Sequence, residues 1–464
     1  MTKDRRITLV NVVNDTTLYR ATRMPALSLA QLAAYIPENW DVRIVDETVE
    51  TFNAFQHVPG SDIVGFSGGN VCNAERIFDH LAQVREYEEL TMADETTVIA
   101  GGYVASANIP GIAERVDSKV IGPGELAIQQ LLSDFENREL QAVYEGIRIP
   151  MNELLAPDFS GFDIPAYGQS INWPVQTSVS CNNICGFCSA RLVFGQGYES
   201  RDPEQVLEDI AHIPEGSRLY FVDPNLVTFS KEGLARARTL FKGLAKKGIT
   251  WFGSVSFPIS EHDDILQLMK DSGCAGVLIG YDSGSSVSLE AVSEAKVPKG
   301  KDLVDHYVQG SRKIQEKYGI PITGTFVMGF DTDDQTSCDN AARIAKESKM
   351  FDAQYLMFTP LPGTRMYDAL DQEGRIFDKN WEHYDFSDVV FQPNNFSPRE
   401  LRNAVVSMYE QTMPRMLKMY RRLGLIRDRP DEIRVESLKQ RAIRDQERAR
   451  EAERQRRQPA NAGH

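Results

Sequence analysis

Hydrophobic and polar positions along the first third of the chain alternate between short β-branched runs and amphipathic helical stretches. The predicted strands are 7–10, 42–45, 63–67, 97–100 and 118–121, and the predicted helices include 28–35 and 73–86. Short buried strands separated by amphipathic helices are typical of a parallel sheet with helices on both faces. The pattern therefore predicts a doubly wound, Rossmann-type α/β domain over residues 1–145.

Glycine-rich turns follow three of these predicted strands. They read Ser67-Gly68-Gly69-Asn70, Gly101-Gly102 and Gly122-Pro123-Gly124. Ligands of doubly wound sheets bind at the carboxyl ends of the strands, where glycines let a ligand approach the backbone closely. Ordinary turn chemistry explains any one of these turns well, but it explains all three together less well. We therefore expect a ligand at this edge of the sheet.

The rest of the chain divides into four parts. Residues 146–174 are rich in Pro, Asn, Asp and Gly, which predicts a linker. In residues 175–370, six βα units in series predict a partial (β/α)6 parallel barrel. A small helical C-terminal cap is predicted over 371–427, followed by a charged tail over 428–464. The predicted barrel strands are 176–180, 218–222, 250–256, 276–280, 322–328 and 354–359.

Composition and charge narrow the class of protein. With 42% apolar residues, 25% charged residues and a net charge of −15, a fibrous or wholly disordered chain is excluded and nucleic acid is a poor partner. No apolar run approaches the ~20 residues of a membrane span, and the N-terminus has no signal-peptide pattern. We therefore expect a cytoplasmic protein. The basic stretch 439–457 predicts a solvated, partly helical tail, with contact to RNA or a membrane as the alternative.

Three of the six cysteines lie within eight residues. Cys181, Cys185 and Cys188 form a CxxxCxxC motif at the end of the first predicted barrel strand. Three thiolates on a tight loop suit a 4Fe–4S cluster with one open iron, whereas structural zinc wants four protein ligands. The spacing thus favours the cluster over zinc. The other cysteines, in apolar or helical surroundings, are predicted to be buried free thiols: Cys72, Cys274 and Cys338.

With this motif in place, the chain resembles the radical S-adenosylmethionine (SAM) enzymes. The resemblance is carried by CxxxCxxC, by Phe187 just before the last cysteine, and by the later strand ends 220–225, 273–283 and 324–331. In that family the three cysteines hold the cluster, its open iron chelates SAM, and one-electron reduction releases a 5′-deoxyadenosyl radical. The resemblance implies a reductant such as a flavodoxin or ferredoxin. It also implies that SAM is bound by Phe187, Asp282, Ser283, Gly324 and Met328, with Asp282 replacing the commoner Glu.

A narrower resemblance involves the N-terminal region. Residues 24–145 are similar to the cobalamin-binding domain that precedes the barrel in one subclass, and segments 361–364 and 381–386 are similar to members that act on bacteriochlorophyll and hopanoid precursors. The subclass implies a cobalamin site formed by Ser67, Gly101, Gly102 and Gly122. The DxHxxG motif, whose His ligates cobalt in other cobalamin domains, is absent. Cobalamin would therefore bind without a protein imidazole, or the domain keeps the fold without the cofactor.

These resemblances imply a cobalamin-dependent radical SAM enzyme. Its expected reaction is methylation of an unactivated carbon in a small-molecule lipid, pigment or natural-product precursor. A radical SAM oxidase or cyclase without methyl transfer is the second hypothesis. A non-catalytic cobalamin or zinc sensor is the third. The sequence identifies neither the substrate nor a catalytic general base.

Overall fold

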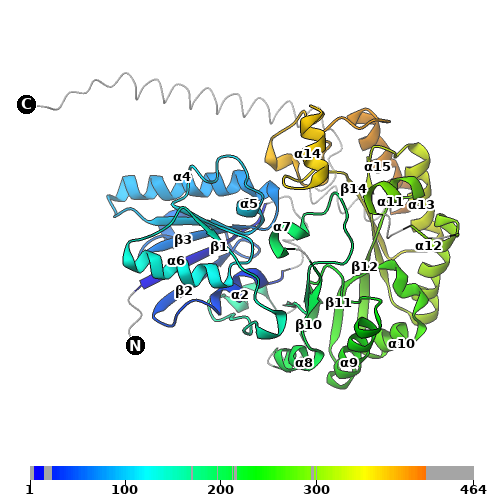
Figure 1. The fold of residues 1–464 in the computed structure, drawn as a ribbon, viewed down its shortest axis with the longest axis horizontal. Helices are drawn as coiled ribbons and strands as arrows, with labels where there is room; N and C mark the ends of the chain where they lie inside the picture. The colour runs from blue at the N-terminus through cyan, green and yellow to red at the C-terminus, as the bar shows by residue number, and fades with distance from the viewer. Residues whose placement is uncertain are drawn as a thin grey trace, which may run out of the picture.

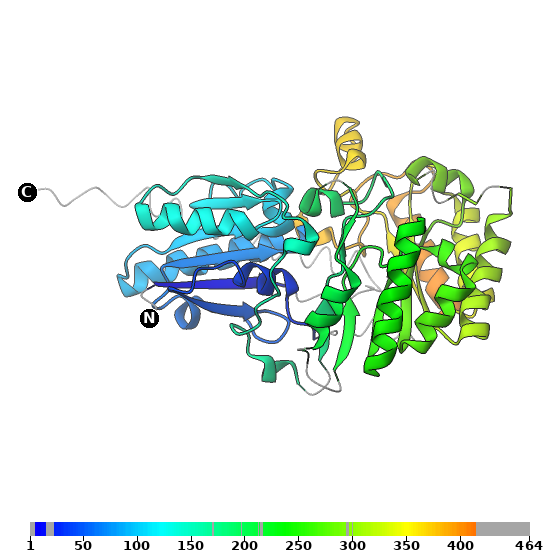
Figure 2. The ribbon, with the colours of Figure 1, turned by 60° about the horizontal axis from the view of Figure 1, so that its bottom comes forward.

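A computed structural model describes residues 5–14, 23–168, 171–195, 197–211, 213, 217–293, 297–298 and 300–413. The predicted charged tail and residues 414–427 of the predicted C-terminal cap lie outside these residues. The described chain forms two six-stranded parallel sheets that lie side by side in the molecule (Figures 1 and 2). The predicted α/β fold class, with a helical C-terminal region, is confirmed. In the described part of the chain, no helix combines the length and the apolar character that crossing a bilayer requires.

The N-terminal sheet has the strand order β2-β1-β3-β4-β5-β6. Its strands are β1 (Arg5–Val12), β2 (Trp40–Asp46), β3 (Ile63–Gly68), β4 (Thr97–Gly101), β5 (Ser118–Ile121) and β6 (Val143–Glu145). Its helices are α2 (Leu27–Ala33), α3 (Ala54–His57), α4 (Ala74–Thr91), α5 (Gly102–Ser106) and α6 (Glu125–Asn137), with the 3-10 turn η1 (Val71–Asn73). The strand order reverses between β1 and β3, which is where doubly wound sheets open a ligand crevice.

Both faces of this sheet are buried. Within β1, Leu9 packs into the core beneath α2 and α6, whereas its neighbour Val10 packs into the core beneath α4 (Figure 1). This alternation follows from the two-residue period of a strand. Strand β6 was not among the predicted strands because only Tyr144 of its three residues is buried. It is a strand because its backbone pairs in parallel with β5. Backbone pairing does not produce a hydrophobic pattern in the sequence of the strand itself.

The second sheet forms the partial barrel, with the strand order β14-β13-β12-β11-β10-β7. Its strands are β7 (Asn172–Val175), β10 (Arg218–Phe221), β11 (Thr250–Val255), β12 (Cys274–Asp282), β13 (Ile322–Met328) and β14 (Asp352–Met357). The outer helices are α8 (Pro203–Ala211), α9 (Lys231–Lys247), α10 (Asp263–Asp271), α11 (Ser286–Ser293), α12 (Leu303–Arg312) and α13 (Gln335–Glu347), with 3-10 turn η4 (Phe257–Glu261) and π turn η6 (Lys313–Lys317). Among the described residues β7 and β14 do not pair, so the barrel is open.

The first barrel strand differs from the prediction. It is β7 and not 176–180, and three of the four residues of β7 lie in the segment predicted as a linker. Within 176–180, β8 (Ser178–Val179) pairs instead with β9 (Glu199–Ser200) in a two-stranded antiparallel ribbon. Pro174 interrupts the strand pattern of β7, but an edge strand tolerates a proline. The linker also contains the 3-10 turns η2 (Met151–Glu153) and η3 (Ile164–Tyr167). The domain boundaries themselves stay a prediction.

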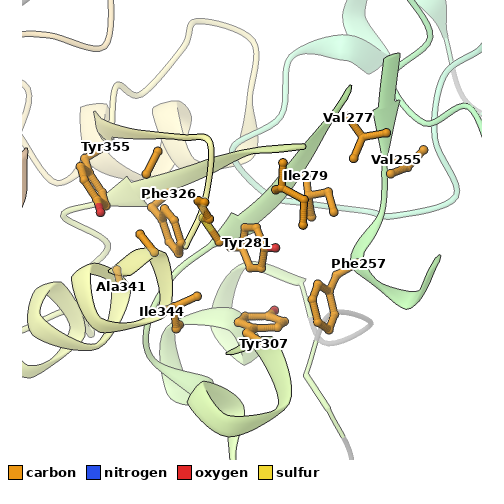
Figure 3. Close-up of a cluster of buried hydrophobic side chains, with 14 of the residues drawn as sticks. Val255, Phe257, Val277, Ile279, Tyr281, Tyr307, Phe326, Ala341, Ile344 and Tyr355 are labelled. Atoms are coloured by element: carbon orange, nitrogen blue, oxygen red, sulfur yellow. The ribbon is translucent and has the colours of Figure 1, made fainter. Parts of the chain in front are cut away.

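The core of the barrel lies between its sheet and the outer helices. Tyr281 of β12 packs against Phe257, Tyr307 and Phe326, with ring centroids 5.0–5.5 Å apart (Figure 3). Its hydroxyl lies 2.6 Å from the Ser311 hydroxyl, so the buried phenol has a hydrogen-bond partner. Because this face of the strands is filled by the helices, the opposite face is the one that remains for a ligand.

The C-terminal region is helical, as predicted, but it is shared between the two sheets. Helix α14 (Arg365–Gln372) follows β14, and α15 (Pro398–Thr412) packs on α13 and β14. The turn η7 (Trp381–His383) instead contacts η1 and α4, and Trp381 and Tyr384 are buried in the N-terminal core. The segment therefore fastens the barrel to the N-terminal sheet.

Candidate functional site

A cavity of about 550 Å³ lies where the carboxyl ends of the two sheets meet. The N-terminal sheet lines it with residues at the ends of β1, β3, β4 and β5. The barrel contributes Gln176 after β7, Val222 after β10, Val179 of β8, and Val193 and Phe194 of α7 (Ala190–Phe194). The lining is mostly apolar with a few polar groups, and its volume is in the range of cofactor pockets. Both sheets thus present their ligand-binding edges to one space.

All four residues predicted for cobalamin line this cavity: Ser67, Gly101, Gly102 and Gly122. The two adjacent glycines have different structural roles. Gly101 is extended, with φ −144°, and a Cβ there would project into open space. Gly102 has φ +74°, and a Cβ there would lie 2.9 Å from the Gly68 carbonyl oxygen. Gly101 therefore shapes the cavity, whereas Gly102 permits the turn from β4 into α5.

The CxxxCxxC loop connects β8 to α7 and is anchored on three sides. The Gly186 amide donates to the Val292 carbonyl of α11 at 3.2 Å, and the Gly186 carbonyl accepts from the Met366 amide of α14 at 3.4 Å. The Phe187 ring lies 5.4 Å from the ring of Phe330, which follows β13. Distant barrel segments thus position the loop.

Asp223, just after β10, holds the strand that enters this loop. Its carboxylate accepts hydrogen bonds from the Thr177 amide at 3.2 Å, the Thr177 hydroxyl at 2.9 Å and the Ser178 hydroxyl. Burial raises the pKa of Asp223, and these donors together with Arg236 oppose that shift. The sequence places Asp223 at a strand end but does not reveal this role. Its hydrogen-bond partners, Thr177 and Ser178, lie about 45 residues earlier in the chain.

The six cysteines fall into two environments. Cys181 and Cys185 are half-buried and Cys188 is exposed. Cys72 and Cys338 are buried as predicted, whereas Cys274 is half-buried at the start of β12, which corrects the prediction of a buried residue. Burial raises the pKa of each of these three thiols to about 12. Metal ligands are thiolates, and a thiol with so high a pKa stays protonated near neutral pH. The loop cysteines are therefore the better cluster ligands.

Within the described ranges, no three His, Cys, Asp or Glu side chains surround a position for a single metal ion. A 4Fe–4S cube spreads its thiolates over separate irons, so its ligands need not converge on one point. The assignment of the cluster to Cys181, Cys185 and Cys188 stays a prediction.

Asp282 and Ser283 lie at the carboxyl end of β12. Asp282 has φ +62° at a register shift in the pairing of β12 with β13. The fully buried Ser283 donates its hydroxyl to Asp333 at 3.1 Å, and Asp333 also accepts from the Ser288 hydroxyl at 2.6 Å and the Phe330 amide at 3.0 Å. Asp333, which the sequence analysis missed, therefore links the end of β12 to the residue that supports Phe187.

Gly324 and Met328 lie on the helix-facing side of β13, together with Phe326. Met328 is fully buried, and a Cβ at Gly324 would lie 2.6 Å from the Met350 sulfur. These two residues can offer a ligand only backbone atoms. The half-buried side chains lie on the opposite face of the strands, and their alternation with buried neighbours is visible in the sequence: Tyr220, Phe252, Thr323, Thr325 and Val327.

The chain is similar in sequence to several proteins that are named for the reaction they catalyse. No family model matches the chain. It is 25% identical to the bacteriochlorophyllide d C-12(1)-methyltransferase of Chlorobaculum tepidum, over 84% of this chain and 83% of that protein. It is 24% identical to the hopanoid C-2 methylase of Rhodopseudomonas palustris, over 77% of this chain and 66% of that protein. An anaerobic magnesium-protoporphyrin IX monomethyl ester cyclase of Rubrivivax gelatinosus is 23% identical, over 70% of this chain and 55% of that protein.

A solved structure shares the fold over most of the chain. The radical SAM methyltransferase TsrM of Kitasatospora setae, solved with cobalamin and a 4Fe–4S cluster, matches with a TM-score of 0.60 and 15% identity, over 80% of this chain and 78% of that one. The resemblance to the cobalamin-binding subclass of radical SAM proteins is confirmed. At 15% identity, this likeness shows that the two proteins share their fold.

The cluster and the cobalamin that the resemblance implies can be tested against the residues present. Three accessible thiols on a loop anchored through its backbone match the donor chemistry of a cluster. At the N-terminal sheet, a Cβ at either Gly69 or Gly101 would project into open space, so these glycines form a cradle that larger residues would fill. The residues fit both groups.

Proposed function

We propose that the protein is a cobalamin-dependent radical SAM enzyme that methylates an unactivated carbon of a small-molecule lipid, pigment or natural-product precursor. The observation that carries the proposal is the cavity between the facing strand ends. It brings Gly101 and Gly122 to the same space as Gln176 and Val222, at the end of the barrel where the CxxxCxxC loop begins. The similarity to methyltransferases of bacteriochlorophyllide and hopanoids supports the reaction class.

The chain's own contribution is to hold two reactive groups at one shared space and to keep water out. Cys181, Cys185 and Cys188 would hold the cluster, and the glycine turns of the N-terminal sheet would cradle the corrin. When bound, the cluster with SAM supplies a radical for hydrogen abstraction, and cobalamin supplies the methyl group. Val193 and Phe194 of α7 give the cavity an apolar wall on the barrel side. Such a lining excludes water, which protects a reactive radical from side reactions.

The substrate is best found by untargeted comparison of metabolites between a deletion strain and its parent. The anaerobically reconstituted protein is then assayed with that substrate and SAM carrying a deuterated methyl group. We expect one 5′-deoxyadenosine and one S-adenosylhomocysteine for each deuterium-labelled product. An unlabelled product would overturn the methyltransferase proposal.

The second candidate is a radical SAM oxidase or cyclase without methyl transfer. The observation that favours it is the similarity to the anaerobic ester cyclase. This enzyme would form 5′-deoxyadenosine and a product that has lost hydrogen, with no S-adenosylhomocysteine.

Iron and sulfide analysis of the same preparation tests the sensor hypothesis, because a non-catalytic zinc protein would contain neither iron nor sulfide.

We further propose a cytoplasmic location and a flavodoxin or ferredoxin as the one-electron donor. The absence of a membrane-crossing helix among the described residues is compatible with this location. Turnover with NADPH, a flavodoxin reductase and flavodoxin tests the donor. Turnover with dithionite but with neither protein donor would contradict it.

A further inference from the structure

The cavity contains two charged side chains that keep a buried atom without a protein partner. Among the described residues that line it, only Glu125 and Arg148 carry a charge. One carboxylate oxygen of Glu125 and the Nη2 nitrogen of Arg148 are both buried with no hydrogen-bond partner. Buried polar atoms in proteins are almost always paired, and unpaired charged groups are especially unfavourable. A ligand in the cavity is the available source of both partners.

Both side chains come from one corner of the N-terminal sheet. Glu125 begins α6, directly after the Gly122-Pro123-Gly124 turn that ends β5. Arg148 lies shortly after β6, where the Gly146 amide donates to the Ile121 carbonyl of β5 at 2.7 Å. Gly146 is pressed against the turn so closely that a Cβ there would lie 1.7 Å from the Pro123 carbonyl oxygen. The β5/β6 corner, residues 122–125 and 146–148, is therefore one packed unit.

Arg148 is oriented by the barrel side of the cavity. Its Nη1 nitrogen donates to the Gly197 carbonyl at 3.0 Å, beyond the end of α7. A Cβ at Gly195 would lie 3.1 Å from Nη2, so the guanidinium rests against this glycine. One edge of the planar guanidinium is thus fixed by the protein, and the N–H groups on Nη2 remain for a ligand.

We propose that the β5/β6 corner binds the nucleotide tail of cobalamin, with Arg148 paired to the phosphodiester and Glu125 accepting from amide N–H groups of the corrin. The inference rests on the proposed function, because it assumes cobalamin in this cavity. The phosphodiester is the one anionic group of cobalamin, and a guanidinium matches phosphate oxygens with directed N–H donors. The corrin carries primary amides around its edge, which suit a carboxylate that lacks a partner.

The experiment is equilibrium dialysis of the full-length protein against three corrinoids. Hydroxocobalamin and cobinamide phosphate both carry the phosphate, whereas cobinamide lacks it. Arg148→Ala should weaken the binding of hydroxocobalamin and cobinamide phosphate about 10- to 100-fold and leave cobinamide unchanged, as expected for a charge-assisted hydrogen bond. Arg148→Lys should restore part of the lost affinity, because lysine keeps the positive charge but lacks the paired N–H donors of the guanidinium. Glu125→Leu should weaken all three corrinoids equally, because all three carry the amides.

Arg343→Ala is the matched control, because Arg343 is an exposed residue of α13 that pairs with Glu347. It should leave all three affinities unchanged. Equal effects of Arg148→Ala on all three corrinoids, or no effect on any, would overturn the inference while leaving cobalamin binding itself intact. If Arg148→Ala does not fold, the native protein decides: equal affinity for cobinamide and cobinamide phosphate overturns the inference, and a preference for the phosphate supports it. A native protein that binds none of the three overturns the proposed function as well.

Discussion

The Tyr103 hydroxyl donates a 2.8 Å hydrogen bond to the Pro362 carbonyl, 259 residues further along the chain. Tyr103 is in α5, directly after the Gly101-Gly102 turn, and Pro362 is in the loop between β14 and α14. Burial raises the pKa of Tyr103, with a smaller contribution from Cys188. One buried bond thus joins the cavity edge of the N-terminal sheet to the barrel beside the CxxxCxxC loop.

Tyr103→Phe should lower the free energy of unfolding by about 1–2 kcal/mol, because it leaves the Pro362 carbonyl buried without its donor. Urea unfolding followed by tryptophan fluorescence measures the effect. Tyr87→Phe is the control, since the Tyr87 ring packs edge-on against the exposed Phe55. Equal stability changes in the two variants would show that the Tyr103–Pro362 bond contributes little to holding the sheets together.

Cys181→Ala, Cys185→Ala and Cys188→Ala should each abolish the brown cluster absorbance and the formation of 5′-deoxyadenosine. Two thiolates hold a four-iron cube poorly, and the open iron needs the other three irons fixed. Iron content and anaerobic product analysis provide the measurement.

The isolated cysteines supply the controls for the cluster variants. Cys72→Ala, Cys274→Ala and Cys338→Ala should keep the cluster and show at most a small packing loss, since their thiols have a pKa near 12 and stay protonated. Loss of the cluster in Cys274→Ala alone would mean that the ligands have been assigned to the wrong residues.

Gly101→Val should weaken the binding of hydroxocobalamin at least about 10-fold while the cluster survives, because the side chain enters the cavity from an extended backbone. Gly101→Ala should have a smaller effect. Gly102→Val should instead destabilise the fold by about 1–3 kcal/mol, since a β-branched residue suits φ +74° badly and meets the Gly68 carbonyl. Corrin absorbance after gel filtration and urea unfolding separate the two effects. Full turnover without cobalamin would favour the oxidase or cyclase.

Glu47 should make the N-terminal unit sensitive to acid. It is buried and accepts from Arg76 at 2.6 Å and from His80 at 3.1 Å. Burial raises the pKa of Glu47, but His80 and Arg76 outweigh burial and hold it at about 2, below the ordinary 4.5. A lowered carboxyl pKa stabilises the fold above the unfolded value, and this stabilisation is lost as the pH falls from 4.5 toward 2.

The stabilisation at stake is about 3 kcal/mol. Urea unfolding of the native protein and Glu47→Gln, compared at several acidic pH values, measures it. The variant should be less stable near neutral pH, and the difference should shrink as the pH falls. Parallel pH profiles would contradict the role of the Glu47 carboxylate.

Local patterns in the sequence determined the α/β class, the parallel sheets, most strands and the cysteine motif. Strand β13 has the predicted bounds of 322–328, because a buried strand carries its alternation within its own residues. The glycine turns can also be recognised in the sequence, because the glycines directly follow several predicted strands. The motif formed by Cys181, Cys185 and Cys188 can be recognised from the spacing of its cysteines alone.

Tertiary structure decided which side of each strand faces the open space and which distant residues meet. Gly324 and Met328 turned toward the helices because the register of the neighbouring strands and the packing of α12 and α13 set the face. Arg148 reached Gly197, and Tyr103 reached Pro362, only once the two sheets were opposed. A residue's own neighbours in sequence determine its backbone preference, but its contacts depend on distant chain segments, as Tyr103 and Pro362 show at a separation of 259 residues.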